Sequence, residues 1–405
     1  MKLSRFGLLA RIAVGILAVP LVAKAQAPIR IGASLAQTGV YAAIGQDQLR
    51  GYQLCVKHLN DKGGVLGRKL ELVVYDDGSD PATAVRLYEQ LISQDKVDLV
   101  LGPNGAAITD PVADVTEKHK TPMVSAGSAI TSIFTKGRRF IFGMFTLGEF
   151  QLEGLLDLGA KKGLKTVALI TPDDLAGRAL TQGTIELAKK KGLQVVFADA
   201  YPLGTTDFSA ILTKVRAANP DVLGVGTNVF EDGVAITRRM KTLDVNPRMI
   251  GFSPAVSQPK LYEVLGRDGE FVYAAALWLP ELVEVRAGGL VPIARQYPGA
   301  REFYESYRKE FPGASVAANA YGGCQILVEA IRRVGSLDRA KLRDAISKMD
   351  HNTVFGRFRV DRGGVQIGHQ MLLFQWQDGK RVIVWPEELA AVKARFPTPP
   401  WSQRP

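Results

Sequence analysis

The sequence predicts an α/β fold with two doubly wound lobes, each built on a parallel sheet and joined to the other by a three-strand hinge. Short apolar runs alternate with amphipathic helical patterns along most of the chain, which is typical of parallel strands covered by helices on both faces. This alternation begins near Ile29 and begins again near Thr166. A length of 405 residues also suffices for two domains with separate cores.

Residues 1–25 are expected to be a secretory signal peptide. Basic residues flank an apolar run over residues 6–22, and Ala23-Lys24-Ala25 provides a cleavage site of the A-x-A type. A membrane anchor would need about 20 uninterrupted apolar residues, and Arg11 interrupts this run. We therefore expect cleavage after Ala25 and an exported mature protein that does not itself span the membrane.

The charge of the chain gives no sign of a nucleic-acid partner. Loss of the signal peptide would leave 47 of the 51 basic residues against 40 acidic ones, a net charge of about +7 spread along the chain. Neither a basic patch nor a nucleic-acid-binding module is recognisable. The two cysteines, Cys55 and Cys324, both lie on expected helices. Export permits a disulfide between them, and packed free thiols fit equally well.

The first lobe is expected to comprise residues 26–143 and 281–354. Its expected elements are strand 29–35, helix 46–60, strand 69–75, helix 82–93, strand 97–101, a helix from Ala106 and a strand ending at Ser125. Pro81 fits the first turn of its helix, and Ser79 or Asp80 is available as the cap. Helices at 299–309, 316–333 and 338–349 follow much later in the chain.

The second lobe is expected to comprise residues 144–280 and 355–395. Its expected strands are 166–170, 194–200, 221–227, 249–252 and 271–279, separated by helices at 175–191, 207–218 and 232–243. Three further strands, 355–360, 370–377 and 380–385, follow near the end, with a turn at Asp378-Gly379 between the last two. Hinge strands are expected near residues 142–145, 275–279 and 354–358, and residues 396–405 as an extended tail.

The two runs of strands and helices resemble each other, as duplicated lobes would. Asp98-Leu99-Val100-Leu101-Gly102-Pro103-Asn104 has a counterpart in Asp221-Val222-Leu223-Gly224-Val225-Gly226-Thr227-Asn228. A repeat longer than about a hundred residues indicates duplicated domains rather than a solenoid. Asn104 and Asn228 would then face each other across the gap between the lobes.

Two neighbouring strands of the first lobe end in small residues. Asn104-Gly105-Ala106 follows one strand and Ser125-Ala126-Gly127-Ser128 follows the next. Ligands of open α/β sheets bind beyond the carboxyl ends of the strands, and small residues let backbone N–H groups approach a ligand closely. A helix that starts at Ala106 would also favour an anion at its N-terminus. The pattern favours a cleft for a small acid, and ordinary turns between strand and helix remain the alternative.

The sequence gives little support for an enzyme. The four histidines, His58, His119, His351 and His369, are scattered, and we interpret them as surface or helix-end residues. Neither a G-x-S-x-G nor an H-E-x-x-H motif is present. Asp76, Asp77 and Asp80 fit turn and cap positions better than a cation site. We therefore expect no catalytic residues, no metal and no cofactor.

Several motifs resemble those of the leucine/isoleucine/valine-binding proteins. They are Gln37-Thr38-Gly39, Gly45-Gln46-Asp47, Gly63-Gly64-Val65-Leu66-Gly67-Arg68-Lys69, Tyr75-Asp76-Asp77-Gly78-Ser79-Asp80-Pro81 and Thr206-Asp207-Phe208-Ser209, in order along nearly the whole mature chain. This family comprises the substrate-binding subunits of ABC transporters for branched-chain amino acids and related ligands. The resemblance implies the type I periplasmic binding protein fold, a periplasmic location and ABC permease subunits as partners.

The resemblance also implies where the ligand binds. The first carboxylate-binding loop falls on Asn104, Gly105 and Ala106, where Ala106 replaces a hydroxyl residue of the family. The second falls on Ser125, Gly127, Ser128 and Ala129, in which Ser128 retains a hydroxyl. The aromatic residues that cover the ligand correspond to Ile44, Ala176 and Asn228, and the acidic partner of the ligand's ammonium corresponds to Ser253.

These departures leave the ligand open between an amino acid and an amine-free acid. A buried ammonium without a carboxylate nearby is unfavourable. Glu231 or Asp232 could supply that carboxylate, although both also fit as caps of the following helix. An amine-free carboxylic acid, aliphatic or aromatic, fits about as well, with apolar surface from Tyr41, Phe145 or Phe230.

The sequence therefore predicts a monomeric solute-binding protein. Its two lobes would close on a small carboxylate, an amino acid or related organic acid, and deliver it to a permease. The alternative is a ligand-sensing domain of the same fold that acts through a signalling partner, although such domains are normally tethered to a membrane or fused to a signalling domain.

Overall fold

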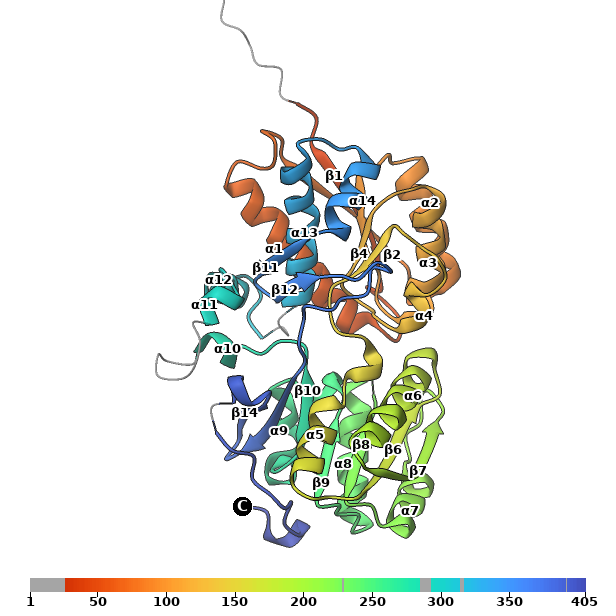
Figure 1. Cartoon of the computed structure of the whole chain (residues 1–405), viewed down its shortest axis with the longest axis vertical. Coiled ribbons are helices and arrows are strands. Elements are labelled where there is room, and N and C mark those ends of the chain that lie inside the picture. The colour runs from red at the N-terminus through yellow and green to blue at the C-terminus, as the bar shows by residue number, and fades with distance from the viewer. Residues whose placement is uncertain (1–25, 228, 285–292, 314–316, 391) are drawn as a thin grey trace, which may run out of the picture.

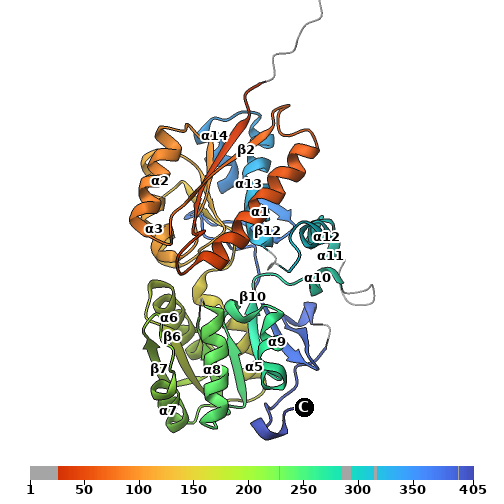
Figure 2. The same ribbon diagram turned by 180° about the vertical axis from the view of Figure 1, so that it is seen from behind.

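The computed structural model describes residues 26–405 except 228, 285–292, 314–316 and 391. The expected signal peptide, residues 1–25, lies outside the described part. The chain forms two lobes stacked along the long axis of the molecule, and three connections run between them (Figures 1 and 2). The predicted α/β class with two doubly wound lobes is confirmed.

The first lobe is built on a five-stranded parallel sheet in the order β2-β1-β3-β4-β5. The strands are β1 (Ile29–Leu35), β2 (Leu70–Asp76), β3 (Leu99–Leu101), β4 (Met123–Ser125) and β5 (Ile141–Gly143). The interior strands β3 and β4 and the edge strand β5 are buried along their whole length, as expected of parallel strands with a helix layer on each face.

Helices cover both faces of this sheet. One layer contains α1 (Ala42–Asp61), α13 (Ala318–Val334) and α14 (Arg339–Ser347), and the other contains α2 (Pro81–Ser93) and α3 (Ala106–Lys118). α2 begins as expected, because Asp80 Oδ1 accepts the Thr83 N–H at 2.7 Å. A disulfide between Cys55 and Cys324 joins α1 to α13 and settles the alternative that the sequence left open.

The second lobe is built on a seven-stranded sheet in the order β14-β13-β10-β9-β8-β6-β7. Its strands are β6 (Thr166–Pro172), β7 (Gln194–Tyr201), β8 (Val222–Val225), β9 (Met249–Phe252), β10 (Tyr273–Ala276), β13 (Leu372–Gln377) and β14 (Lys380–Trp385). β13 pairs antiparallel with both β10 and β14. The pairs among β6 to β10 are all parallel. The expected hairpin turn is confirmed, since Asp378 and Gly379 both have positive φ.

Helices also flank this second sheet on both faces. α5 (Glu153–Lys161) and α6 (Leu175–Lys190) pack on one face, and α7 (Ser209–Ala218), α8 (Phe230–Thr242) and α9 (Lys260–Leu265) lie on the other. α5 was not expected from the sequence. None of the helices within the described residues is long and apolar enough to cross a bilayer.

The duplication inferred from the sequence is visible in the topology. The first five strands are ordered 2-1-3-4-5, and the parallel part of the second sheet is ordered 7-6-8-9-10. β1 and β3 of the first lobe therefore correspond to β6 and β8 of the second. In this topology the strand order reverses between the first and third strands, and the crevice at their carboxyl ends is the usual ligand site.

Contacts of the segment after β11 bear on where the third connection between the lobes begins. β11 (Asp350–Thr353) forms a hairpin with β12 (Gly356–Arg359), and the Gly143 N–H of β5 donates to the Gly364 carbonyl at 2.8 Å. From the sequence, the first lobe is expected to end at Val354, with the chain passing into the second lobe after it. We propose instead that the first lobe extends to about residue 368.

The remaining segments lie at the edges of the two lobes. α4 (Thr131–Phe134) is a single short turn after β4, and α10 (Glu281–Glu284), α11 (Ile293–Gln296) and α12 (Ala300–Glu310) lie beside the connection that leaves β10 (Figure 1). The proline-rich tail packs on the second lobe. Its Trp401 is buried, and the indole N–H donates to the Val245 carbonyl at 3.1 Å.

Candidate functional site

A cavity of about 120 Å³ lies between the two lobes. On the first lobe it is lined by the segments that follow β1, β3 and β4, and on the second by those that follow β6, β8 and β9. In the duplicated topology, β1, β3 and β4 of the first lobe correspond to β6, β8 and β9 of the second. α3 contacts α6 across the gap, so the N-termini of two helices from different lobes converge on one cavity.

Most of the site residues expected from the sequence line this cavity. They are Tyr41, Ile44, Asn104, Gly105, Ala106, Gly127, Ser128, Ala129, Phe145, Ala176 and Ser253. Ser125 and Phe230 do not line it. Ser125 is buried beneath the second loop, and Phe230 begins α8 with Lys260 over its ring. Asn228 lies outside the described residues, so its expected position opposite Asn104 stays a prediction.

The N-terminus of α3 faces the cavity without a side chain to cap it. Its N-cap residue is Gly105, whose φ of +81° suits glycine, and a Cβ there would lie 3.1 Å from the Tyr41 ring. None of the described side chains caps α3, and its first turn contains no acidic residue. The first N–H groups of a helix have no partner within the helix. This end of α3 therefore offers backbone donors to an anion.

The two loops of the first lobe hold each other in position. Asn104 and Gly127 form an isolated parallel bridge, and the Ser125 hydroxyl donates to the Ser128 carbonyl at 2.6 Å. A Cβ on Gly127 would lie 2.3 Å from the Pro103 carbonyl oxygen, so only glycine permits this approach. Asn104 is 3% exposed, and its side-chain Oδ1 accepts no hydrogen bond from the described residues.

The hydroxyl of Ser253, the residue expected to correspond to the family's acidic residue, is engaged within the second lobe. It donates to the Thr227 carbonyl at 2.7 Å and accepts the Thr227 N–H at 2.9 Å. These bonds join the end of β9 to the loop after β8. The side chain lines the cavity while serving mainly to shape its wall.

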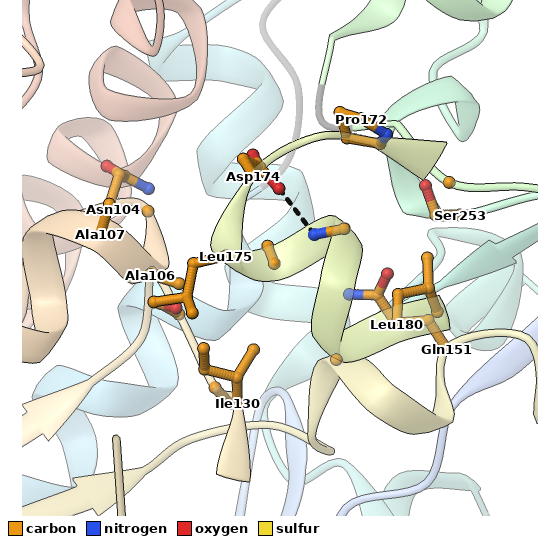
Figure 3. Close-up of a pocket in the computed structure, with 18 of the residues that line it drawn as sticks. Asn104, Ala106, Ala107, Ile130, Gln151, Pro172, Asp174, Leu175, Leu180 and Ser253 are labelled. Carbon is orange, nitrogen blue, oxygen red and sulfur yellow. Dashed lines mark hydrogen bonds between the residues drawn. The ribbon is translucent and has the colours of Figure 1, made fainter. Parts of the chain in front are cut away.

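Among the described residues that line the cavity, the one carboxylate is that of Asp174, which sequence reasoning missed. Asp174 is the N-cap of α6, and its Oδ1 accepts the Gly177 N–H at 2.6 Å, the dashed line in Figure 3. Burial raises the pKa of Tyr41, and the Asp174 charge raises it further. That coupling links the two walls, since Tyr41 belongs to the first lobe. The duplication of the lobes could have pointed to Asp174 from the sequence. The loop after β6, which contains Asp174, corresponds to the loop after β1, which contains Tyr41.

Neither acid considered from the sequence reaches the cavity. Glu231 is exposed. Asp232 is partly buried, and its Oδ2 accepts hydrogen bonds from the Tyr201 hydroxyl at 3.1 Å and the Thr227 hydroxyl at 3.3 Å. Burial raises the pKa of Asp232.

The rest of the wall is mainly apolar or small. Sequence reasoning missed Ala107, Ile130, Gly148, Gln151, Pro172, Leu175, Gly177, Leu180, Gly226 and Thr227. Figure 3 shows Ile130 from the first lobe and Leu175 and Leu180 from α6 around the cavity. Within the described residues, His, Cys, Asp and Glu form no group that could hold a metal ion.

Comparison with known proteins agrees with this architecture. The chain is 26% identical over 392 residues to Leu/Ile/Val-binding protein homolog 7 of Brucella abortus (strain 2308), covering 93% of this chain and 96% of the relative. In fold it matches the Streptococcus pneumoniae branched-chain amino acid transporter substrate-binding protein LivJ in complex with isoleucine, with a TM-score of 0.76, 21% identity, and 91% and 100% of the two chains covered.

A second solved structure takes a different ligand. It is an ABC transporter solute-binding protein of R. palustris in complex with benzoate, with a TM-score of 0.75, 17% identity, and 88% and 95% of the two chains covered. Residues 28–381 match the sequence profile described as periplasmic binding protein. This family and fold are those of substrate-binding proteins rather than enzymes. The chain belongs to the periplasmic binding protein family.

Proposed function

We propose that this protein is an extracytoplasmic solute-binding protein that captures a small carboxylate between its lobes and delivers it to an ABC permease. The uncapped N-terminus of α3 at the interlobe cavity carries this proposal. Its backbone N–H groups and the Ser128 hydroxyl would receive the carboxylate, although Ala106 lacks the hydroxyl found in the family.

The connections between the lobes support a closing motion. Three segments of the described chain link the lobes, and the cavity walls come from both sides of that hinge (Figure 2). A ligand that touches both walls binds the closed form better and shifts the population toward it. A permease could then recognise the closed, loaded form.

Export is supported by two independent features. The first 25 residues have the composition of a signal peptide. The disulfide between Cys55 and Cys324 suits an oxidising compartment such as the periplasm. We propose cleavage after Ala25 and action as a monomer.

Ligand binding is tested by thermal unfolding of residues 26–405, refolded to remove bound ligand, against branched-chain amino acids, their amides, and aliphatic and aromatic carboxylates. A ligand at about 100 times its dissociation constant adds about 2.7 kcal/mol to the unfolding free energy. Ala106→Asp places a negative charge where the carboxylate is proposed to bind and should abolish the shift. Ala82→Asp is the matched control, because Ala82 is an exposed residue in the first turn of α2.

Delivery is tested separately by uptake of the identified ligand into proteoliposomes that contain the cognate permease. Uptake that depends on the added binding protein is the expected result. Tight binding with no contribution to uptake would favour the sensing function instead. No shift with any member of the ligand panel would overturn the proposed carboxylate ligand.

A further inference from the structure

A second cavity, of about 550 Å³, lies on the first lobe. It is lined by residues next to β5, by the end of α14, and by β12 with the loop that follows it. Figure 1 shows α14 and β12 on the first lobe, and none of the residues that line the interlobe cavity lines this one. The second cavity is therefore separate from the proposed solute site, and we call it the basic groove.

Positive charge dominates the lining of the basic groove. Its cations are Arg139, Arg343, Lys348, Arg359 and Arg362. The one acid among the described lining residues is Asp361, whose Oδ1 accepts the Gly363 N–H at 2.8 Å and the Val365 N–H at 2.9 Å. This carboxylate thus holds its own loop in shape. No run of basic residues marks the groove in the sequence, because separate segments supply its cations.

Most of these cations lack an acidic partner. Arg343 pairs with Asp344 at 2.9 Å, and the other four form no ion pair with the described residues. The register of β11 and β12 places Asp350 opposite Arg359, yet Asp350 accepts both of its hydrogen bonds from Arg357, at 2.8 and 2.6 Å. Like charges that share a groove repel each other, and the same charges concentrate anions there. The groove is thus suited to a multiply charged anion.

We propose that the basic groove is a second binding site, for a ligand that carries adjoining phosphate groups. A phosphate group has a charge of about −1.5 to −2 at neutral pH, so two of them match the excess of cations in the groove. Arginine also suits phosphate, because its planar guanidinium can donate two parallel hydrogen bonds to it. Ile367, which is 50% exposed at the groove, offers apolar contact to the group that carries the phosphates. A free diphosphate or the headgroups of an anionic bilayer would supply this chemistry.

The first test is calorimetric titration of residues 26–405 with inorganic pyrophosphate. The titration is made at physiological ionic strength, where exposed charges more than about 8 Å apart are largely screened. We expect pyrophosphate to bind and citrate, a multiply charged anion without phosphate, to bind at least about tenfold more weakly, as the loss of one charged hydrogen bond would cause. Equal affinity for citrate and pyrophosphate would overturn the phosphate assignment.

The decisive variant is Lys348→Gln/Arg362→Gln. Both residues are exposed, so the substitutions should leave the fold intact, which thermal unfolding checks. We expect pyrophosphate affinity to fall at least about tenfold, because charged hydrogen bonds are lost. The solute identified by thermal unfolding should bind as before, since neither residue lines the interlobe cavity. The matched control, Arg86→Gln/Lys190→Gln, removes the same charges at exposed positions outside the groove and should bind pyrophosphate like the wild type.

Co-sedimentation with phosphatidylglycerol vesicles, with phosphatidylcholine vesicles as the uncharged control, distinguishes the two sources of phosphate. Binding to phosphatidylglycerol that the double variant loses would assign the phosphates to a bilayer. Pyrophosphate binding without vesicle binding would assign them to a free diphosphate. The proposal is overturned if neither probe binds, if the double variant binds both as the wild type does, or if the control variant loses as much affinity. Tighter binding of poly-L-glutamate than of either phosphate probe would also overturn it and would indicate an acidic protein segment as the partner.

Discussion

Thr146 and His369 are held together by several close contacts at the hinge. The Thr146 N–H donates to His369 Nδ1 at 3.3 Å, and the Thr146 hydroxyl donates to the His369 carbonyl at 2.9 Å. On the other side of the ring, Nε2 donates to the Leu277 carbonyl at 3.0 Å, and the ring stacks on Phe355 with centroids 4.4 Å apart. Thr146, Leu277 and His369 lie on three different connections between the lobes, so one neutral imidazole joins all three.

We expect the unfolding free energy to decrease as the pH falls from about 6.5 to about 4. Burial lowers the pKa of His369 from 6.5 to about 4. Between these values the unfolded chain binds a proton that the folded protein does not, so the stabilisation is complete above pH 6.5 and is lost through this window. The total loss is at most about 3 kcal/mol. A protonated Nδ1 can no longer accept the Thr146 N–H.

Urea unfolding between pH 7 and pH 4 checks this expectation. His369→Gln should be less stable than wild type at pH 7 and should show a weaker pH dependence below pH 6.5. His119→Gln is the control, because His119 hydrogen-bonds to Glu89 within the first lobe rather than at the hinge. Equal pH dependence in wild type and His369→Gln would show that His369 does not titrate in this window.

Ser128→Ala should weaken ligand binding with little effect on stability. The Ser128 side chain lines the cavity, and a hydrogen bond to a charged group contributes about 1.5–3 kcal/mol, or a tenfold to hundredfold change in affinity. Titration with the ligand identified by thermal unfolding measures the change. Ser132→Ala is a suitable control because the Ser132 hydroxyl is buried without a partner among the described residues. Unchanged affinity in Ser128→Ala would exclude this hydroxyl from the site.

The alternating strands and helices were predictable because each depends on local signals. The cap at Asp80 and the turn at Asp378-Gly379 follow from neighbouring residues alone. α5 was missed because it contains two glycines that weaken its helical pattern. Gly154 is required by packing instead, since a Cβ there would lie 2.8 Å from the Trp385 ring, more than two hundred residues away in sequence.

The part of the site formed by loops at the carboxyl ends of strands was predictable from the sequence. The loops with Asn104 and Ser128 combine small residues with the ends of apolar runs, and both reach the cavity. Asp174 was missed because an Asp just before a helix is already explained by its role as the helix cap, so nothing near it in the sequence indicates a second role at the cavity. His369 was interpreted as a surface or helix-end residue, which is wrong. Its partners at Thr146 and Leu277 are brought to it only by the assembled hinge.

Gly127→Ala should destabilise the first lobe and impair binding together. A Cβ at this position would lie 2.3 Å from the Pro103 carbonyl oxygen and 2.9 Å from Asn104 Cα, so the two cavity loops would have to separate. Overpacking of this kind typically costs about 1–3 kcal/mol. Gly269→Ala is the control, because a Cβ there meets no atom closer than 3.7 Å. Wild-type stability and affinity in Gly127→Ala would show that the loops tolerate separation.

Removal of the disulfide should lower stability without affecting the ligand. Cys55 and Cys324 are 269 residues apart in sequence and join α1 to α13 in the first lobe, and neither cysteine lines the cavity. A cross-link that closes so long a loop restricts the unfolded chain, and its loss typically costs about 2–5 kcal/mol. The double variant Cys55→Ala/Cys324→Ala should therefore unfold at lower urea concentration, as should wild type after reduction. Ligand affinity measured well below that concentration should remain close to the wild-type value, because neither Cys55 nor Cys324 lines the cavity. A variant as stable as the oxidised protein would mean that packing between α1 and α13 alone holds the two helices together.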